Sequence, residues 1–209
     1  MDWKLKTIDL GEVQIQLKLP ADPESLLEDL AEQDAKDCHD TDPYWSWLWD
    51  ASADMSRCIL SEHWKLPLKT LELGCGCGLA GIAGLLAGLD VTFSDLVPDA
   101  VELAQHNAAQ NGFTDAEGLV LDWNHPQKAK FDLLIASDIL YEASNHQPIL
   151  RLAEKMLLKG GQFWIGDPGR SIVSDFIHAA RDAGWSTQLR RNGASGSSKF
   201  QLLVMTNTA

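Results

Sequence analysis

The sequence is poor in basic residues. Seventeen Lys and Arg side chains face thirty Asp and Glu, which gives a formal charge of -13. Proteins that bind DNA or RNA usually carry a basic surface, so we expect no nucleic-acid partner. An acidic surface of this kind instead suits a cationic partner.

Long apolar runs and paired cysteines are also scarce. The longest uncharged window, residues 73–89, holds six glycines. It is therefore too weakly hydrophobic to span a bilayer, and we expect no membrane partner. The N-terminus lacks the apolar region of a signal peptide, and the four cysteines show no disulfide framework, so we expect a cytoplasmic protein. Cys75 and Cys77 have no partner pair at zinc spacing, and we expect no metal. The oligomeric state is not indicated.

The chain length and its 45% hydrophobic content suit one compact α/β domain with a short appendage. Residues 44–209 are predicted to form this domain and residues 1–43 the appendage. Alternating runs at 3–10 and 13–19, separated by Gly11-Glu12, predict a β-hairpin. Asp22 and Pro23 then predict the start of a helix. Asp50 is predicted to cap a helix over 51–61.

From Thr70 onward, strand-like and helix-like segments alternate, which predicts a parallel sheet covered on both faces. The helix between the strands at 118–123 and 131–137 is missing or very short. A helix at 147–158 is expected to end at Gly160-Gly161, before a strand at 162–167. The last two strands follow each other without a helix, which predicts an antiparallel pair at the sheet edge.

The segment "LELGCGCGLAG", residues 71–81, places Gly74, Gly76 and Gly78 in the first strand-to-helix turn. Ligands of such sheets bind at the carboxyl ends of the strands. A Walker loop is excluded because the segment has no lysine. A dinucleotide fingerprint over Gly76, Gly78 and Gly81 leaves Gly74 unexplained. The remaining type is the G-x-G-x-G turn of S-adenosylmethionine enzymes, here preceded by Glu72.

Acidic residues after the next two strands favour that last type. Asp95 ends the second strand, where a carboxylate can accept both hydroxyls of a ribose. Asp122 ends the third strand and is followed by Trp123, a pair suited to an adenine amino group and ring. Together with the glycine turn, these residues predict an adenosyl-binding site.

Residues 44–206 resemble the class I S-adenosylmethionine-dependent methyltransferases. The resemblance implies a Rossmann-like, doubly wound sheet of order 3-2-1-4-5-7-6 with strand 7 antiparallel. It implies S-adenosyl-L-methionine as cofactor and S-adenosyl-L-homocysteine as product. The cofactor-binding residues it implies are Trp49, Glu72, Gly74, Cys75, Gly76, Gly78, Asp95, Leu96, Asp122, Trp123 and Ser137.

Two further segments, "PYWSWLWDAS" and "SDILY", are similar to the seven-β-strand protein-lysine methyltransferases. "GDPGR", residues 166–170, is similar to the branch that methylates the β subunit of electron transfer flavoprotein, whose bacterial relatives are often named predicted nicotinamide N-methylases. The implied reaction is methylation of an amine nitrogen, with a protein lysine as acceptor. The alternative is a small-molecule N-methyltransferase acting on an amine or a nicotinamide-like ring nitrogen. Asp138 would hold the incoming amine as a catalytic residue, and Tyr141 would shape its pocket.

Two features of the sequence, the aromatic segment at 44–49 and Arg170, each allow two interpretations. A strand over 44–49 would place Trp45, Trp47 and Trp49 on one face, either as an apolar plug or as a cover whose rings line an amine channel. Trp49 is the best cofactor candidate among them. Arg170 would either contact the acceptor or brace the rim through Asp167.

Overall fold

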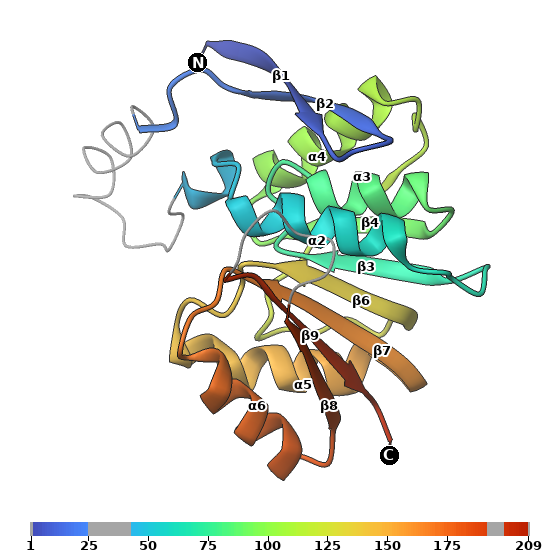
Figure 1. Ribbon diagram of the computed structural model, residues 1–209, viewed down its shortest axis with the longest axis vertical. Helices are drawn as coiled ribbons and strands as arrows, with labels where there is room; N and C mark the ends of the chain where they lie inside the picture. The colour runs from blue at the N-terminus through green and yellow to red at the C-terminus, as the bar shows by residue number, and fades with distance from the viewer. Residues whose placement is uncertain (1, 25–42, 192–198, 209) are drawn as a thin grey trace.

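The computed structural model describes residues 2–24, 43–191 and 199–208, and a seven-stranded sheet forms its centre (Figure 1). The strand order is β5-β4-β3-β6-β7-β9-β8. The strands are β3 (Lys69–Leu73), β4 (Asp90–Asp95), β5 (Glu117–Val120), β6 (Phe131–Ser137), β7 (Leu157–Asp167), β8 (Ser186–Arg191) and β9 (Gln201–Thr206). β9 runs antiparallel to both β7 and β8, and the other pairs are parallel. The predicted α/β class and the order 3-2-1-4-5-7-6 are confirmed.

Helices cover the two faces of this sheet (Figure 1). The first layer contains α2 (Asp50–Ser61), α3 (Leu79–Leu86) and α4 (Pro98–Gln110), and the second contains α5 (His146–Met156) and α6 (Val173–Asp182). Side chains of β6 alternate between the layers: Leu133 and Ile135 join the core of the first, and Leu134 and Ala136 join the core of the second. Because both faces of the strand are covered, its central residues 133–136 are apolar without interruption.

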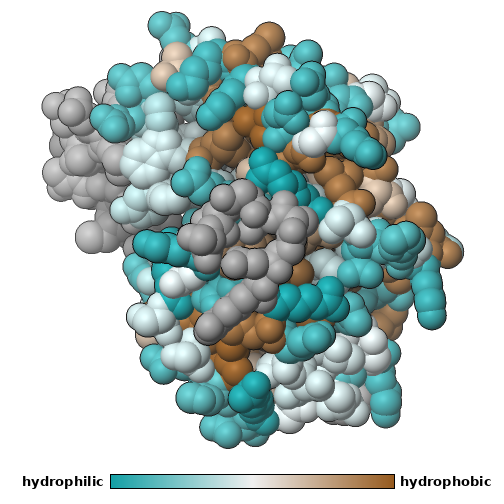
Figure 2. All heavy atoms as spheres, in the orientation of Figure 1, coloured by the Kyte–Doolittle hydropathy of each residue, from teal (hydrophilic) through white to brown (hydrophobic). Residues whose placement is uncertain are grey.

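The predicted N-terminal hairpin is confirmed as β1 (Trp3–Asp9) paired with β2 (Gln14–Pro20). It docks through β2, whose Ile15 and Leu17 are fully buried in the core of the first layer. Most of β1 is exposed. Figure 2 shows hydrophobic residues on the part of the surface that the hairpin, α2 and α3 share. The helix predicted from Asp22 falls mainly on residues 25–42, outside the described residues.

The structure corrects two predicted element ends. β7 begins at Leu157, directly after α5, so Gly160-Gly161 lie within the strand and do not end the helix. Gly161 allows this path, because a Cβ there would lie 2.7 Å from the carbonyl oxygen of Asp132 on the neighbouring strand. The N-cap of α2 is Trp49 and makes no side-chain capping bond, so the prediction that Asp50 caps this helix is wrong.

Two short 3-10 helices, η1 (Pro43–Ser46) and η2 (Ala143–Asn145), precede α2 and α5. No helix forms between β5 and β6, as predicted. Within the described part of the chain, no helix combines the length and the apolar character needed to cross a bilayer.

Candidate active site

A cavity of about 340 Å³ opens at the carboxyl ends of β3, β4 and β6. All the predicted site residues except Gly78 line it, although they come from five separate stretches of the chain. Those that line it are Trp49, Glu72, Gly74, Cys75, Gly76, Asp95, Leu96, Asp122, Trp123, Ser137, Asp138 and Tyr141. The lining also includes residues that sequence reasoning missed, among them Cys77 in the glycine turn and Glu142, Asn145 and Pro148, which follow the Asp138–Tyr141 motif into α5.

The glycine turn is held in a conformation that side chains disfavour. Gly74 and Gly76 have φ values of 62° and 49°, in the left-handed region. The Cys75 amide donates to the Ser94 carbonyl at 2.9 Å, and the Gly78 amide donates to the Cys75 carbonyl at 2.7 Å. The turn therefore presents bare backbone to the cavity, and these two hydrogen bonds help to fix its shape.

Gly78 does not line the cavity, and packing between helices explains why this position is glycine. Its φ is 81°, and a Cβ at this position would lie 2.8 Å from the Cβ of Ala104 on α4. The glycine thus lets the start of α3 approach α4 closely.

Asp95 fixes the turn from the adjacent strand. Its two carboxylate oxygens accept from the amides of Gly76 at 3.0 Å and Val97 at 3.2 Å. Burial raises the pKa of Asp95 above its ordinary value, and the hydrogen bonds from these amides oppose the rise. Each oxygen retains a lone pair, so the carboxylate can accept further donors in the cavity.

Glu72 is an acid in an unusual environment. It is 2% exposed, and its Oε2 has no hydrogen-bond partner among the described residues. Burial raises the pKa of Glu72 to about 8, the Gly81 amide lowers it, and the nearby Asp95 raises it. Oε2 faces α3, where a Cβ at Gly81 would lie 2.4 Å from it, so this oxygen is enclosed in the wall of the cavity.

Asp122 lies at the cavity rim and is more exposed than the other two acids. Its Oδ1 accepts from the Asn124 amide at 2.8 Å, and its Oδ2 lies 2.8 Å from Nδ1 of His125. The hydrogen bond from Asn124 is the main reason that the pKa of Asp122 is lowered. Trp123 extends beneath the glycine turn, where its Cζ2 would lie 3.5 Å from a Cβ at Gly74.

Asp138 stands just beyond the end of β6 with a φ of 62°, the only non-glycine residue of the described chain with a positive φ. Short polar residues tolerate this region best, which suits aspartate here. Its amide donates to the Gly166 carbonyl at 2.8 Å, and its Oδ1 accepts from Nη1 of Arg170. Burial raises the pKa of Asp138, the Arg170 guanidinium lowers it, and the charges of Asp167 and Asp50 raise it.

Arg170 bridges two acids. The same Nη1 lies 3.3 Å from Oδ2 of Asp167, a residue that is 1% exposed at the end of β7. Oδ1 of Asp167 in turn accepts from the amides of Gly169 and Arg170, both at 2.7 Å. The geometry agrees with the bracing interpretation and extends it, because the sequence did not indicate the contact with Asp138.

The aromatic segment before α2 is not a strand. η1 and an irregular stretch occupy residues 43–49, so the interpretation that would place three tryptophans on one strand face does not hold. Tyr44, Trp47 and Trp49 pack on one another, with ring centroids 5.6 to 6.1 Å apart. This leaves no room for a cation between the three rings, since a cation–π contact alone needs several ångströms from each centroid. Trp45 packs separately, against the core.

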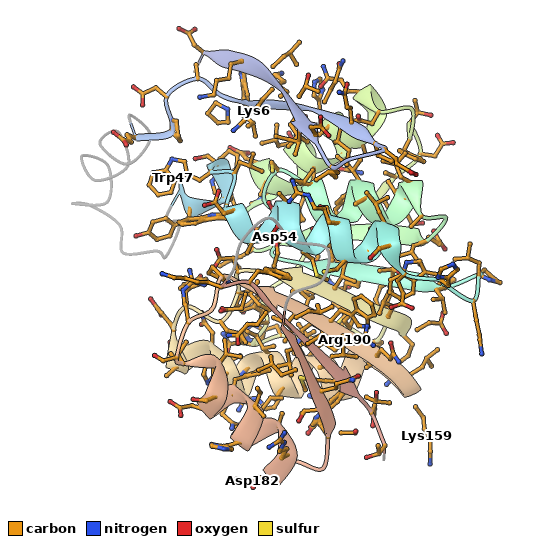
Figure 3. All side chains as sticks on the ribbon, in the orientation of Figure 1. Lys6, Trp47, Asp54, Lys159, Asp182 and Arg190 are labelled. Atoms are coloured by element: carbon orange, nitrogen blue, oxygen red, sulfur yellow. The ribbon has the colours of Figure 1, made fainter. Side chains whose placement is uncertain are left out.

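These rings nevertheless border the cavity (Figure 3 labels Trp47). Trp49 is 39% exposed, and its Nε1 donates to the Tyr44 carbonyl at 3.0 Å. The segment thus forms a preassembled aromatic wall at the mouth.

The cysteines of the turn are buried thiols. Cys75 and Cys77 are both free, and burial raises the pKa of each, to about 12 for Cys77. Over the described residues, no group of three or more His, Cys, Asp or Glu is placed to hold a metal ion.

The charges on the cavity wall have one sign. The titratable acids that line it are Glu72, Asp95, Asp122, Asp138 and Glu142. No Lys, Arg or His of the described chain lines it. Such a cavity favours cationic ligands and disfavours phosphates and carboxylates.

Comparison with known proteins agrees with this geometry. Residues 67–200 match the methyltransferase domain family. The electron transfer flavoprotein beta subunit lysine methyltransferase of Mus musculus is 31% identical over 137 residues, which are 64% of this chain and 54% of that protein. The histidine protein methyltransferase 1 homolog of Dictyostelium discoideum is 32% identical over 126 residues, 56% of this chain and 41% of that protein. The chain thus spans about half the length of these curated relatives.

Among solved structures, the N-methyltransferase NodS of Bradyrhizobium japonicum, in complex with S-adenosyl-L-homocysteine, is similar with a TM-score of 0.61. The match covers 88% of this chain and 98% of that one at 17% identity. At this identity the likeness concerns the fold alone.

Proposed function

Because the chain belongs to the methyltransferase domain family, we propose that it transfers a methyl group from S-adenosyl-L-methionine to an amine nitrogen, with a protein lysine as acceptor. One observation carries this proposal. A glycine turn of bare backbone and a cavity wall with five acidic side chains, and with no Lys, Arg or His of the described chain lining it, meet at the ends of β3, β4 and β6. The named activities of the mouse and Dictyostelium relatives support a protein acceptor.

The residues of the cavity fit this cofactor. It carries an ammonium group and a sulfonium, and the acidic side chains that line the cavity suit such cations. Asp95 has spare lone pairs for ribose hydroxyls, and Trp123 offers a ring face for adenine. When bound, the cofactor supplies an electrophilic methyl group, so the protein has to orient the acceptor nitrogen and exclude water.

The acidic wall also favours binding of an amine acceptor in its protonated form. A lysine amine has a free pKa of about 10.4, so about one part in a thousand is neutral at pH 7.4, a deficit of about 4 kcal/mol. Burial beside another cation lowers that pKa and reduces the deficit. Asp138 would orient the amine through Oδ2, since Arg170 holds Oδ1. Tyr141, 48% exposed at the mouth, would bound the pocket.

The test has two stages. Calorimetry with S-adenosyl-L-homocysteine measures cofactor binding. Host lysate is then incubated with cofactor labelled in the methyl group, and labelled protein is hydrolysed to distinguish methyl-lysine from methyl-histidine. Methyl-lysine in a discrete protein is the expected result. A parallel reaction offers nicotinamide as the acceptor. Label confined to small molecules would instead support the small-molecule N-methyltransferase.

The variant Asp138→Asn tests the role of Asp138, because asparagine tolerates the same backbone conformation. It should retain cofactor binding and lose transfer by about 100-fold, the scale of a positioned acid–base or orienting group. If this variant transfers methyl groups at the original rate, Asp138 has no catalytic role.

A further inference from the structure

Two asparagines, Asn107 on α4 and Asn111 at its C-cap, join the N-terminal hairpin to the rest of the domain. Asn107 and Asn111 are four residues apart and therefore share one face of the helix. Asn111 accepts from the Gln16 amide at 3.0 Å and donates to the Gln16 carbonyl at 2.7 Å. Asn107 accepts from the Lys18 amide at 2.7 Å and donates to the Lys18 carbonyl at 3.2 Å. Two side-chain amides thus make the hydrogen bonds that a neighbouring strand would make with the edge of β2.

Asn107 differs from Asn111 in a third contact. Asn107 is fully buried, and its Nδ2 also donates to the Cys77 carbonyl at 2.9 Å, within the glycine turn. The additional bond of Asn111 goes to the Asn107 carbonyl of its own helix. One amide therefore touches both the hairpin and a residue that lines the proposed cofactor cavity.

The same face of α4 supports the turn at a second point. Ala104, three residues before Asn107, lies where a Cβ on Gly78 would clash. Cys77 stands between Gly76 and Gly78, both with positive φ, and glycines have little conformational preference of their own. The shape of the turn at Cys77 consequently depends on contacts from outside, and a buried carbonyl left unpaired there is strongly unfavourable.

We propose that Asn107 is a positioning residue for the cofactor, which couples docking of the hairpin to the shape of the glycine turn. The inference rests on the proposed function, in which this turn holds the cofactor. Such coupling is reciprocal: the hairpin strengthens cofactor binding, and the bound cofactor strengthens the attachment of β2.

Asn107→Ala and Asn111→Ala form a matched pair, because each removes one amide from the β2 edge and only the first removes the bond to the turn. Titration with S-adenosyl-L-homocysteine should show affinity about tenfold weaker in Asn107→Ala and changed by less than about twofold in Asn111→Ala. Both variants should lower Tm. In the transfer assay, Asn107→Ala should raise the KM for the cofactor and leave kcat nearly unchanged.

Unchanged affinity in Asn107→Ala, or equal weakening in both variants, would overturn the inference. If the unaltered protein does not bind S-adenosyl-L-homocysteine at all, the proposed function fails instead, so the two failures are distinguishable.

Hydrogen exchange on the unaltered protein gives a second test that does not depend on the variants folding. Saturation with S-adenosyl-L-homocysteine should slow exchange of the Lys18 amide, which Asn107 holds, more than that of the Gln16 amide, which Asn111 holds. Equal slowing at both sites, or no change at Lys18, would contradict the coupling.

Discussion

Replacing Glu72 with glutamine is expected to stabilise the protein at alkaline pH. Glu72 is buried on the cavity wall with an unpaired oxygen, and burial raises its pKa to about 8 from an ordinary value of 4.5. The folded state therefore holds this proton more tightly than the unfolded state does. The stability that the protonated carboxyl contributes is complete below about pH 4.5 and is lost as the pH rises through 8.

The size of the effect follows from the two pKa values. Each tenfold change in proton affinity is worth about 1.4 kcal/mol, so the difference between 4.5 and 8 corresponds to about 5 kcal/mol at pH 8 and above. Near pH 6.5 the loss is about 3 kcal/mol by the same relation. Glutamine has a similar shape and cannot ionise, so Glu72→Gln should lack this loss.

Urea denaturation of both proteins at several pH values between 5 and 8.5, without cofactor, measures the difference. The free energy of unfolding of Glu72→Gln minus that of the unaltered protein should rise with pH, at up to about 1.4 kcal/mol per pH unit. Other titrating groups cancel in this difference because both proteins carry them. Parallel pH profiles would refute the argument, since they would mean that Glu72 ionises in the folded protein as easily as in the unfolded chain.

Three further predictions concern the groups around the cavity. Arg170→Gln should shift the acid limb of the pH–rate profile to higher pH, because removal of the guanidinium raises the pKa of Asp138 further; an unmoved limb would argue against this pairing. Gly78→Ala should cost about 1–3 kcal/mol more than Gly112→Ala by urea denaturation, because both glycines have positive φ and only Gly78 would also clash. Equal losses would show that backbone strain alone acts. Cys77, with a pKa raised to about 12, should resist iodoacetamide at pH 8 until denaturant is added, as mass spectrometry of the modified peptide would show.

Local patterns in the sequence were sufficient for the sheet and for most of the cavity. Alternation of apolar strands with helices predicts a parallel sheet, and parallel strands bring their carboxyl ends to one edge. Asp95 and Asp138, which follow different strands, could therefore be assigned to one site before any contact was known. The positive φ of Gly74 and Gly76 is likewise implied by glycine at those positions.

Other features depended on contacts between distant residues. The aromatic segment has a strand-like spacing, yet Tyr44, Trp47 and Trp49 gain more by packing on one another, and tertiary packing overrides weak local preference. The contact of Arg170 with Asp138 crosses from β7 to β6, and no spacing rule predicts it.

The sequence by itself determined the sheet, the glycine turn and the acids beside it, because each follows from periodicity or from the backbone demands of a turn. Only the tertiary structure decided that Glu72 has an unpaired buried oxygen, that Gly78 serves packing, and that Asn107 links the hairpin to the turn. These properties depend on which atoms of distant segments come within a few ångströms, and local sequence patterns carry no information about such distances.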